Sequence, residues 1–300
     1  MKKTFGFVVI SLCIGLFACT NSNNKKVQNQ KDALEADMYE NEKPIPQDIK
    51  GEDVIFYNIF TPTDMSNLIN EYSTFYKSNL INSLNNITKY NQSTSMALNI
   101  GIYGADLNYL WVFEQSQQAA SYVAAIQMLC SQLDIPSNYV TLTAERAEQY
   151  SYNVDSLKSI ARSAYKDITK YLNQSGRGNS AALILLGGWI ETLYIAVNMY
   201  SQPDAKMVSR IATQRFSLNI IINLLQNQQN DLDVAGYLVL LRKLRKAFDD
   251  FVVHVPREAL IIDTINKRIT IKDNDKMKFD TDQINEIRNE TNKIRDMIVH

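Results

Sequence analysis

The stretch AALILLGGWIETLYIAV, residues 181–197, is the most apolar segment of the chain and decides its fold. Its length approaches that of a membrane span. However, Glu191 sits near its middle, Gly187 and Gly188 precede it, and amphipathic helices are predicted on both sides. These features favour a central helix that is packed on all sides by its neighbours over a helix that crosses a bilayer.

The polar and glycine positions of this helix need structural partners. A glycine costs about 1 kcal/mol relative to alanine inside a helix. We therefore expect the backbone of another helix to approach Gly187 and Gly188 closely, with a ligand resting there as the alternative. A carboxylate in apolar surroundings also needs a partner. For Glu191 we expect a buried ion pair or hydrogen bonds from a tyrosine.

A second segment, LNIGIYGADLNYLW at residues 98–111, has the same character. Gly101, Ala105 and Asn108 are three to four positions apart, so they share a helix face that can lie against another helix. Asp106 is again an acid among apolar residues. Asp106 and Glu191 could converge on one interior pocket. Aromatic residues that could surround this pocket are Tyr103, Tyr109, Trp189 and Tyr194.

Helix start and stop signals dominate from residue 61 onward. Thr61-Pro62-Thr63-Asp64 combines an N-cap, a proline at the first helical position and an early acid. Ser175-Gly176 is typical of a helix C-terminus and turn. The predicted helices are 61–90, 93–113, 116–133, a short one from 144, 155–174, 180–200, 204–227, 233–253, 257–268 and a last one from 280.

The period changes near the C-terminus. Residues 269–271 and 277–279 alternate apolar and polar side chains around Asp273-Asn274-Asp275, which is typical of a small hairpin. We predict an all-α fold, a compact multi-helix array with one small β-hairpin. The alternative is a tetratricopeptide-like helical solenoid, although no fixed repeat period is present. The last helix should dock through one apolar stripe: Ile284, Ile287, Ile294 and Ile298.

The N-terminus has the pattern of an export signal. Two lysines are followed by an apolar run over residues 5–18 and then by Cys19. Leu16-Phe17-Ala18-Cys19 resembles the lipobox of bacterial lipoproteins. This resemblance implies that residues 1–18 are removed and that Cys19 is lipidated. Each buried methylene then contributes about 0.8 kcal/mol, so several acyl chains would hold the protein at the membrane.

The export signal and the lipobox divide the chain into three predicted regions. Residues 1–18 are the predicted signal peptide, and residues 19–50 a predicted disordered tether, because this polar segment cannot bury enough apolar surface to offset ordering entropy. Residues 51–300 are predicted to form a single helical domain. Removal of Lys2 and Lys3 takes the formal net charge from −1 to −3. With no basic cluster, nucleic acid is excluded as a partner.

The chain lacks the residue patterns of common catalytic centres. Its two histidines, His254 and His300, do not suffice for a histidine-based zinc site, triad or di-iron site. No phosphate-binding or dinucleotide-binding loop occurs, so no cofactor or metal is predicted. Asp249-Asp250 is a weak metal candidate, because adjacent helical positions point about 100° apart. Cys130 is predicted to be a small buried hydrophobe.

The two apolar segments and the lipobox together resemble a group of uncharacterised helical lipoproteins from Bacteroidetes-type bacteria. The residues that carry the resemblance are 101–107 and 187–194, and no biochemical activity comes with it. In those bacteria an acidic run after the lipidated cysteine marks surface display. Residues 20–24 contain no acid. The resemblance therefore implies an outer-membrane location that faces the periplasm.

These observations predict a non-enzymatic envelope lipoprotein that binds a partner or small ligand, or supports an assembly. Its contacts would be the membrane, through the lipid on Cys19, and a protein of the envelope. The alternative is an enzyme that uses Asp106 and Glu191 as acid and base in a helical pocket. Candidate ligand-binding residues are Tyr103, Trp189 and Tyr194.

Overall fold

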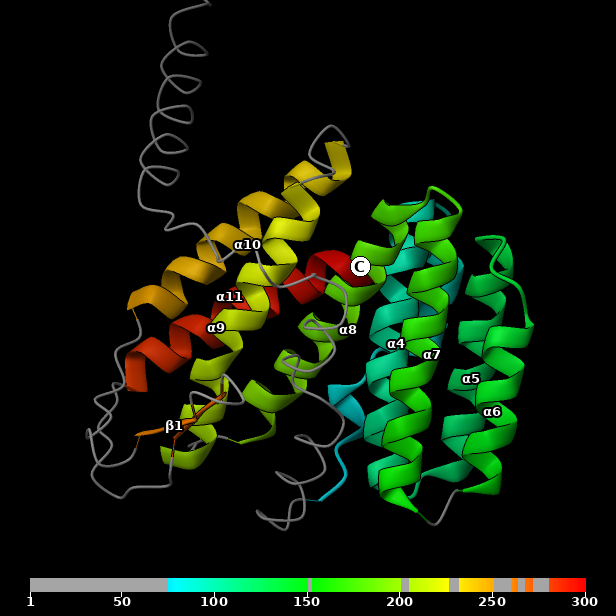
Figure 1. The fold of residues 1–300 in the computed structure, drawn as a ribbon, viewed down its shortest axis with the longest axis horizontal. Helices are drawn as coiled ribbons and strands as arrows, with labels where there is room; N and C mark the ends of the chain where they lie inside the picture. The colour runs from blue at the N-terminus through cyan, green and yellow to red at the C-terminus, as the bar shows by residue number, and fades with distance from the viewer. Residues whose placement is uncertain are drawn as a thin grey trace, which may run out of the picture. The chain divides into compact units, whose positions relative to one another are not determined.

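Helices form almost all of the regular structure in the described part of the chain (Figure 1). The structure, a computed structural model, describes residues 75–150, 153–200, 205–226, 232–250, 260–263, 268–271 and 281–300. These residues belong to the unit Gly51–His300, one of two into which the chain divides. The predicted all-α class is confirmed. The α-helices are α4 (Ser93–Val112), α5 (Ser116–Gln132), α6 (Asn138–Gln149), α7 (Val154–Gln174), α8 (Gly178–Met199), α9 (Ala205–Gln226), α10 (Leu232–Asp250) and α11 (Thr281–Val299).

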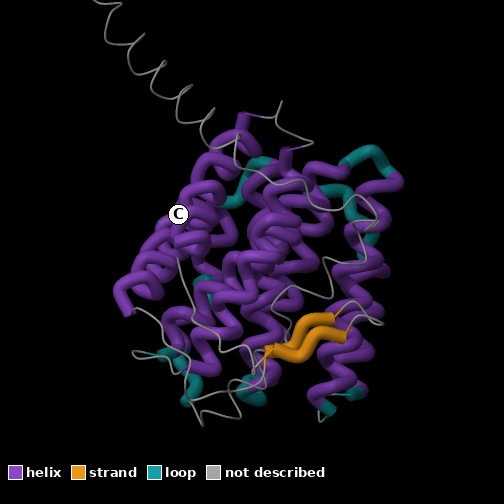
Figure 2. The backbone as a smooth tube through the Cα atoms, turned by 60° about the vertical axis from the view of Figure 1, so that its left-hand side comes forward, coloured by secondary structure: helices purple, strands orange, loops and turns teal. Residues whose placement is uncertain are grey.

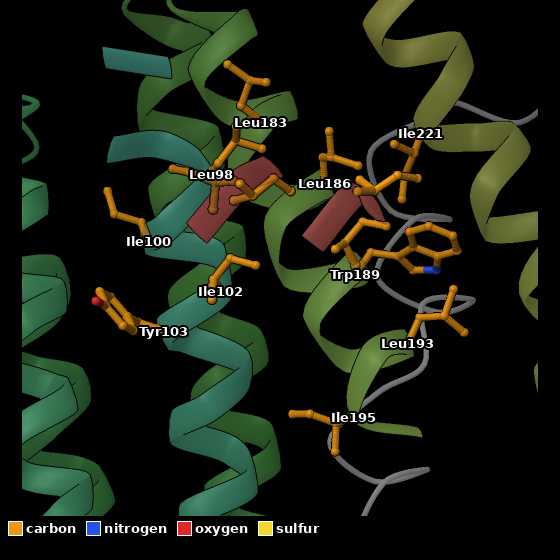
Figure 3. Close-up of a cluster of buried hydrophobic side chains, with 14 of the residues drawn as sticks. Leu98, Ile100, Ile102, Tyr103, Leu183, Leu186, Trp189, Leu193, Ile195 and Ile221 are labelled. Carbon is orange, nitrogen blue, oxygen red and sulfur yellow. The ribbon is translucent and has the colours of Figure 1, made fainter. Parts of the chain in front are cut away.

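Helix α8 is the centre of the packing. It contacts four helices: α4, α7, α9 and α11. In addition, α4 packs on α5, and α10 packs on α9 and α11. Figure 3 shows its apolar side chains in one buried cluster with Leu98 of α4 and Ile221 of α9. In a solenoid each repeat contacts only its neighbours. Here α4 and α8 are in contact although three helices separate them in sequence. This contact pattern differs from that of a tetratricopeptide-like solenoid.

Three glycines let α4 and α8 cross in backbone contact. A methyl group on Gly101 would lie 2.1 Å from the carbonyl oxygen of Ile184 and 2.5 Å from the nitrogen of Gly188. A methyl group on Gly187 would lie 2.0 Å from the carbonyl oxygen of Leu98. Any side chain at these two positions would hold the helices apart. The expected close approach of a helix backbone at the Gly187-Gly188 pair is confirmed.

A tyrosine of α7 fills the remaining space beside this crossing. The Tyr165 hydroxyl donates a hydrogen bond of 3.0 Å to the carbonyl oxygen of Gly101. A methyl group on Gly104 would lie 2.1 Å from the Tyr165 hydroxyl oxygen, so this position too is restricted to glycine while the tyrosine stays in place. The small residues of α4 therefore receive α8 and the Tyr165 side chain of α7.

Helix α8 is a core helix despite its hydropathy. By length and composition it could cross a membrane, but 83% of its most apolar window is buried inside the helical body.

The carbonyl groups at the C-terminal end of α8 accept hydrogen bonds from side chains that are far away in the sequence. The Arg288 guanidinium donates to the Val197 and Tyr200 carbonyl oxygens at 2.7 and 3.3 Å. The Lys77 ammonium donates to the Met199 carbonyl oxygen at 2.8 Å. Cations at a helix C-terminus are favourable.

The predicted helix 61–90 is wrong where the structure describes it. Residues 78–80 and 84–89 form two 3-10 turns, η1 (Ser78–Leu80) and η2 (Leu84–Lys89), and residues 61–74 lie outside the described residues. This stretch is rich in asparagine and serine, whose side chains compete for backbone hydrogen bonds. The Ser83 side chain accepts from the backbone nitrogen of Asn85 at 3.2 Å, which caps η2.

The predicted hairpin of residues 269–271 with 277–279 is not supported. Residues 268–271 form strand β2 (Arg268–Ile271), which pairs antiparallel with β1 (Leu260–Asp263), as Figure 2 shows. Residues 260–263 were expected to be helical. Residues 277–279 lie outside the described residues. Because Ile261 and Ile262 are β-branched and apolar, residues 260–263 suit a strand at least as well as a helix.

The docking of α11 is confirmed. Its side chains at the four predicted isoleucine positions are all buried: Ile284, Ile287, Ile294 and Ile298. The helix contacts α10, α8 and α4. It thereby closes the face of the core on which Glu191 lies.

Candidate functional site: a buried acid cluster and an apolar cavity

Glu191 is held in a buried ion pair. The Arg295 guanidinium of α11 donates two hydrogen bonds, from Nε to Oε2 and from Nη2 to Oε1 of Glu191, both at 3.1 Å. The Glu191 side chain is 0% exposed. The Arg295 guanidinium also lies over the ring of Tyr194, 4.5 Å from its centroid. A planar bidentate pair of this kind fixes both partners in orientation. The expected buried partner of Glu191 is confirmed.

Asp106 meets Glu191 in the same buried cluster, and its side chain is also fully buried. The Asp106 and Glu191 carboxyl groups lie close enough for a proton on one to form a hydrogen bond to the other. The backbone nitrogen of Asn82 donates to Asp106 Oδ2 at 3.1 Å, whereas Asp106 Oδ1 has no donor among the described residues. Two carboxyl groups can share a hydrogen bond only if one is protonated. A proton on Oδ1 of Asp106 satisfies that oxygen.

Burial and charge decide which acid carries the proton. Burial, reinforced by the neighbouring Glu191 charge, raises the pKa of Asp106 well above its ordinary value. Burial also raises the pKa of Glu191, but this rise is smaller than that of Asp106 because the Arg295 guanidinium and the hydrogen bond from Asp106 oppose it. The cluster is therefore neutral Asp106, ionised Glu191 and cationic Arg295. Its net charge of zero limits the desolvation cost.

Asn82 joins this cluster to the rest of the core. Its side-chain amide nitrogen donates to the Tyr90 hydroxyl at 2.9 Å and to Asn99 Oδ1 at 3.2 Å. Its carbonyl oxygen accepts from the Tyr122 hydroxyl at 2.6 Å. The Asn99 side-chain amide in turn donates to the Ile298 carbonyl oxygen of α11 at 3.1 Å. Satisfied buried networks rigidify a core. The two acids are thus surrounded by a hydrogen-bond network that connects α4, α5 and α11.

We expect Asp106→Asn to flatten the pH dependence of stability. The wild-type carboxyl stays protonated when folded and loses its proton above about pH 4 when unfolded. The free energy of unfolding therefore falls by about 1.4 kcal/mol for each pH unit above that value, until the folded-state pKa is reached. The asparagine amide can donate to Glu191 and accept from Asn82 without titrating.

Guanidinium unfolding between about pH 4 and about pH 7 measures this effect. Asp106→Ala serves as the comparison, since it removes both hydrogen bonds and should be less stable than Asp106→Asn at every pH. An Asp106→Asn protein with the wild-type slope would contradict a protonated Asp106.

The cavity between the helices of the α4–α8 region is separate from this cluster. Its volume is about 60 Å³, and residues of α4, α5, α6, α7 and α8 line it. Apolar side chains such as Ile100, Leu107 and Ile168 form most of its wall. Asp106 and Glu191 are not among the lining residues. The two acids converge, as the sequence suggested, but inside packed protein rather than around this opening.

The aromatic residues proposed around the acids lie in different places. Tyr103 packs edge-on against Tyr122, with ring centroids 5.5 Å apart. Figure 3 shows Tyr103 on one side of α4 and Trp189 on the far side of α8, where the Trp189 indole nitrogen donates to Gln214 Oε1 of α9 at 3.3 Å. Tyr194 lies under Arg295. Only Tyr194 of these three touches the ion pair directly.

The other residues singled out in the sequence have structural settings. Asp249 pairs with Arg215 of α9 at 2.9 Å on the surface. Among the described residues no group of three or more potential metal ligands occurs. Cys130 is a buried free thiol, and burial raises its pKa to about 12, which suppresses the reactive thiolate.

Sequence reasoning missed Arg295 and Asn82. Arg295 lies one turn from Ile298 and four positions after Thr291, which is also buried, so it falls on the stripe that docks α11. A cation on an apolar docking stripe is a signal for a buried acid elsewhere. Asn82 carries no comparable signal, because its role depends on the irregular backbone around it.

The structure thus contains two separate features. One is a buried acid–arginine cluster with no net charge, and the other is an apolar cavity. Comparison with protein-family models, with curated proteins and with solved structures finds no match to this chain.

Proposed function

We propose that this chain is a lipid-anchored envelope lipoprotein whose helical domain binds or supports other molecules without catalysing a reaction. The anchor is an acylated Cys19 at the start of a tether over residues 19–50. The helices of residues 51–300 form a compact array at the end of that tether. The partners in this proposal are the membrane, through the lipid, and an envelope protein on the periplasmic side of the outer membrane.

The burial of Asp106 and Glu191 carries the non-enzymatic part of this proposal. A general acid or base must reach the proton that it transfers in a bound substrate. Both carboxyl groups are 0% exposed, and their oxygens are engaged by Arg295, Asn82 and each other. A substrate would first have to displace an ion pair in the core. The pair is better suited to fixing how α4, α8 and α11 pack.

The competing function is acid–base catalysis by the same two acids. One observation favours it, since a carboxyl with a strongly raised pKa next to a second, ionised acid is common at active sites. The two functions predict different effects on stability when the acids are replaced. Active-site acids are often replaced with little loss of stability or with a gain. An acid that holds the core together cannot be removed without destabilising the protein.

We expect Cys19→Ser to release the protein from the membrane fraction. Without the thiol no acyl chain can be attached, and the near-neutral chain has no electrostatic attraction to anionic lipid. Fractionation of cells and labelling with an alkyne fatty acid measure the effect. Cys130→Ala is the matched control, because it removes a buried cysteine and should leave both labelling and membrane retention unchanged. Full membrane retention of Cys19→Ser would contradict the lipid anchor.

A further inference from the structure

The cavity of the α4–α8 region is lined by uncharged side chains. Aliphatic residues of five helices, Ile100, Ile126 and Ile184 among them, form its walls, and Tyr165 borders it. No Asp, Glu, Lys or Arg is among the described residues that line it. An ion placed there would lose its hydration without gaining a counter-charge. The cavity therefore excludes charged molecules and suits an apolar one.

One side chain in this wall lacks a hydrogen bond. Asn108 of α4 is only 8% exposed, and its amide has no partner among the described residues. Most buried side-chain amides in proteins are paired. Trp111 and Tyr139 also line the cavity, and neither the Trp111 indole nitrogen nor the Tyr139 hydroxyl is hydrogen-bonded to a described residue. Asn108 thus carries the only side-chain amide in the described lining, and this amide is not bonded to a described residue.

We propose that this cavity binds a slim, uncharged, mostly apolar molecule whose single hydroxyl or amide group pairs with Asn108. This inference rests on the proposed non-enzymatic binding function and names its ligand class. The volume of about 60 Å³ exceeds the roughly 10–15 Å³ that one water needs by this measure. It is below the roughly 150 Å³ of an engineered cavity that binds benzene. A molecule of about three non-hydrogen atoms, half as many as benzene has, fits these limits.

The test uses ethanol and chloroethane, which have the same carbon chain but differ in hydrogen bonding. Each is titrated into the full chain carrying Cys19→Ser, so that no detergent competes, and side-chain amide signals are followed by NMR. The signal pair absent from Asn108→Leu identifies the Asn108 amide. We expect ethanol to shift this pair and to bind more tightly than chloroethane by about fivefold, the equivalent of one hydrogen bond.

Two variants separate the cavity from non-specific binding. Ala164→Leu fills space in the lining and should weaken both probes by more than about tenfold, the equivalent of lost apolar contacts in a filled site. Ala124→Leu makes the same change at an exposed position of α5 and should change neither affinity. Asn108→Leu should bring ethanol down to the affinity of chloroethane.

Three results would overturn the inference: binding of neither probe, equal affinity for both, or ethanol binding that survives Ala164→Leu. If water alone occupies the cavity, the Asn108 signals will not respond to ethanol, which is the first of these results. Such a failure leaves the proposed anchor untouched, since that fails only if Cys19→Ser stays at the membrane. Far-UV circular dichroism of each variant confirms that the helices are intact.

Discussion

Glu191→Ala should lower the free energy of unfolding by about 3–5 kcal/mol, because it leaves the Arg295 guanidinium buried without its counter-charge. Asp106 would at the same time lose the acceptor for its proton. For a domain of this size the change corresponds to a fall of about 10 °C in the melting temperature. Thermal melts and guanidinium titrations measure it. Glu191→Gln should also destabilise, since an amide cannot neutralise the guanidinium.

A surface ion pair of the same type provides the matched control. Arg215 and Asp249 are 2.9 Å apart, but their side chains are 49% and 42% exposed. Exposed pairs contribute about 0–1 kcal/mol. Asp249→Ala should therefore change stability much less than Glu191→Ala. Equal effects of the two substitutions, or a Glu191→Ala protein as stable as the wild type, would favour the catalytic alternative.

Alanine at Gly101 or Gly187 should destabilise the protein by about 3 kcal/mol or more. The added methyl group would meet backbone of the facing helix, the Ile184 carbonyl oxygen in one case and the Leu98 carbonyl oxygen in the other. Backbone cannot rotate away as a side chain can, so α4 and α8 must separate. Overpacking of a tight core costs about 1–3 kcal/mol even where side chains can adjust. Guanidinium titration of each variant measures the loss.

Gly236→Ala is the matched control for this prediction. Gly236 is an exposed glycine of α10, and a methyl group there would meet nothing within 4 Å. The helix propensity of alanine should then raise stability by about 0.5–1 kcal/mol. If Gly187→Ala were as stable as Gly236→Ala, the two helices would not cross in backbone contact at the glycine pair.

The helices could be predicted because their signals are local. Caps and breakers such as the turn at Ser175-Gly176 set the ends of α7 and α8, and the isoleucine stripe of α11 set its buried face. The 3-10 turns of residues 78–89 could not be predicted in this way. Their backbone is held by distant groups, for example by Asp106 at the nitrogen of Asn82. Long-range hydrogen bonds leave no periodic trace in the sequence.

The acid cluster was predictable only in part. Two acids in apolar helices indicate that each needs a partner. The identity of that partner depends on how α11 docks, and residues 104 positions apart meet in the Glu191–Arg295 pair. The cavity was not predictable at all, since it arises from imperfect filling between five helices. Its lining includes Asn108, which the sequence placed only on a face shared with Gly101 and Ala105.

A double-mutant cycle on Glu191 and Arg295 tests most directly whether the acids hold the core together. Glu191→Leu and Arg295→Met are made singly and together, and the free energies of unfolding are compared. If the pair is structural, each single change should cost about 3 kcal/mol or more, while the double variant regains at least about 2 kcal/mol relative to the sum. Small single effects that simply add would mean that the pair does not hold the core together, and would return Asp106 and Glu191 to the role of catalytic acids.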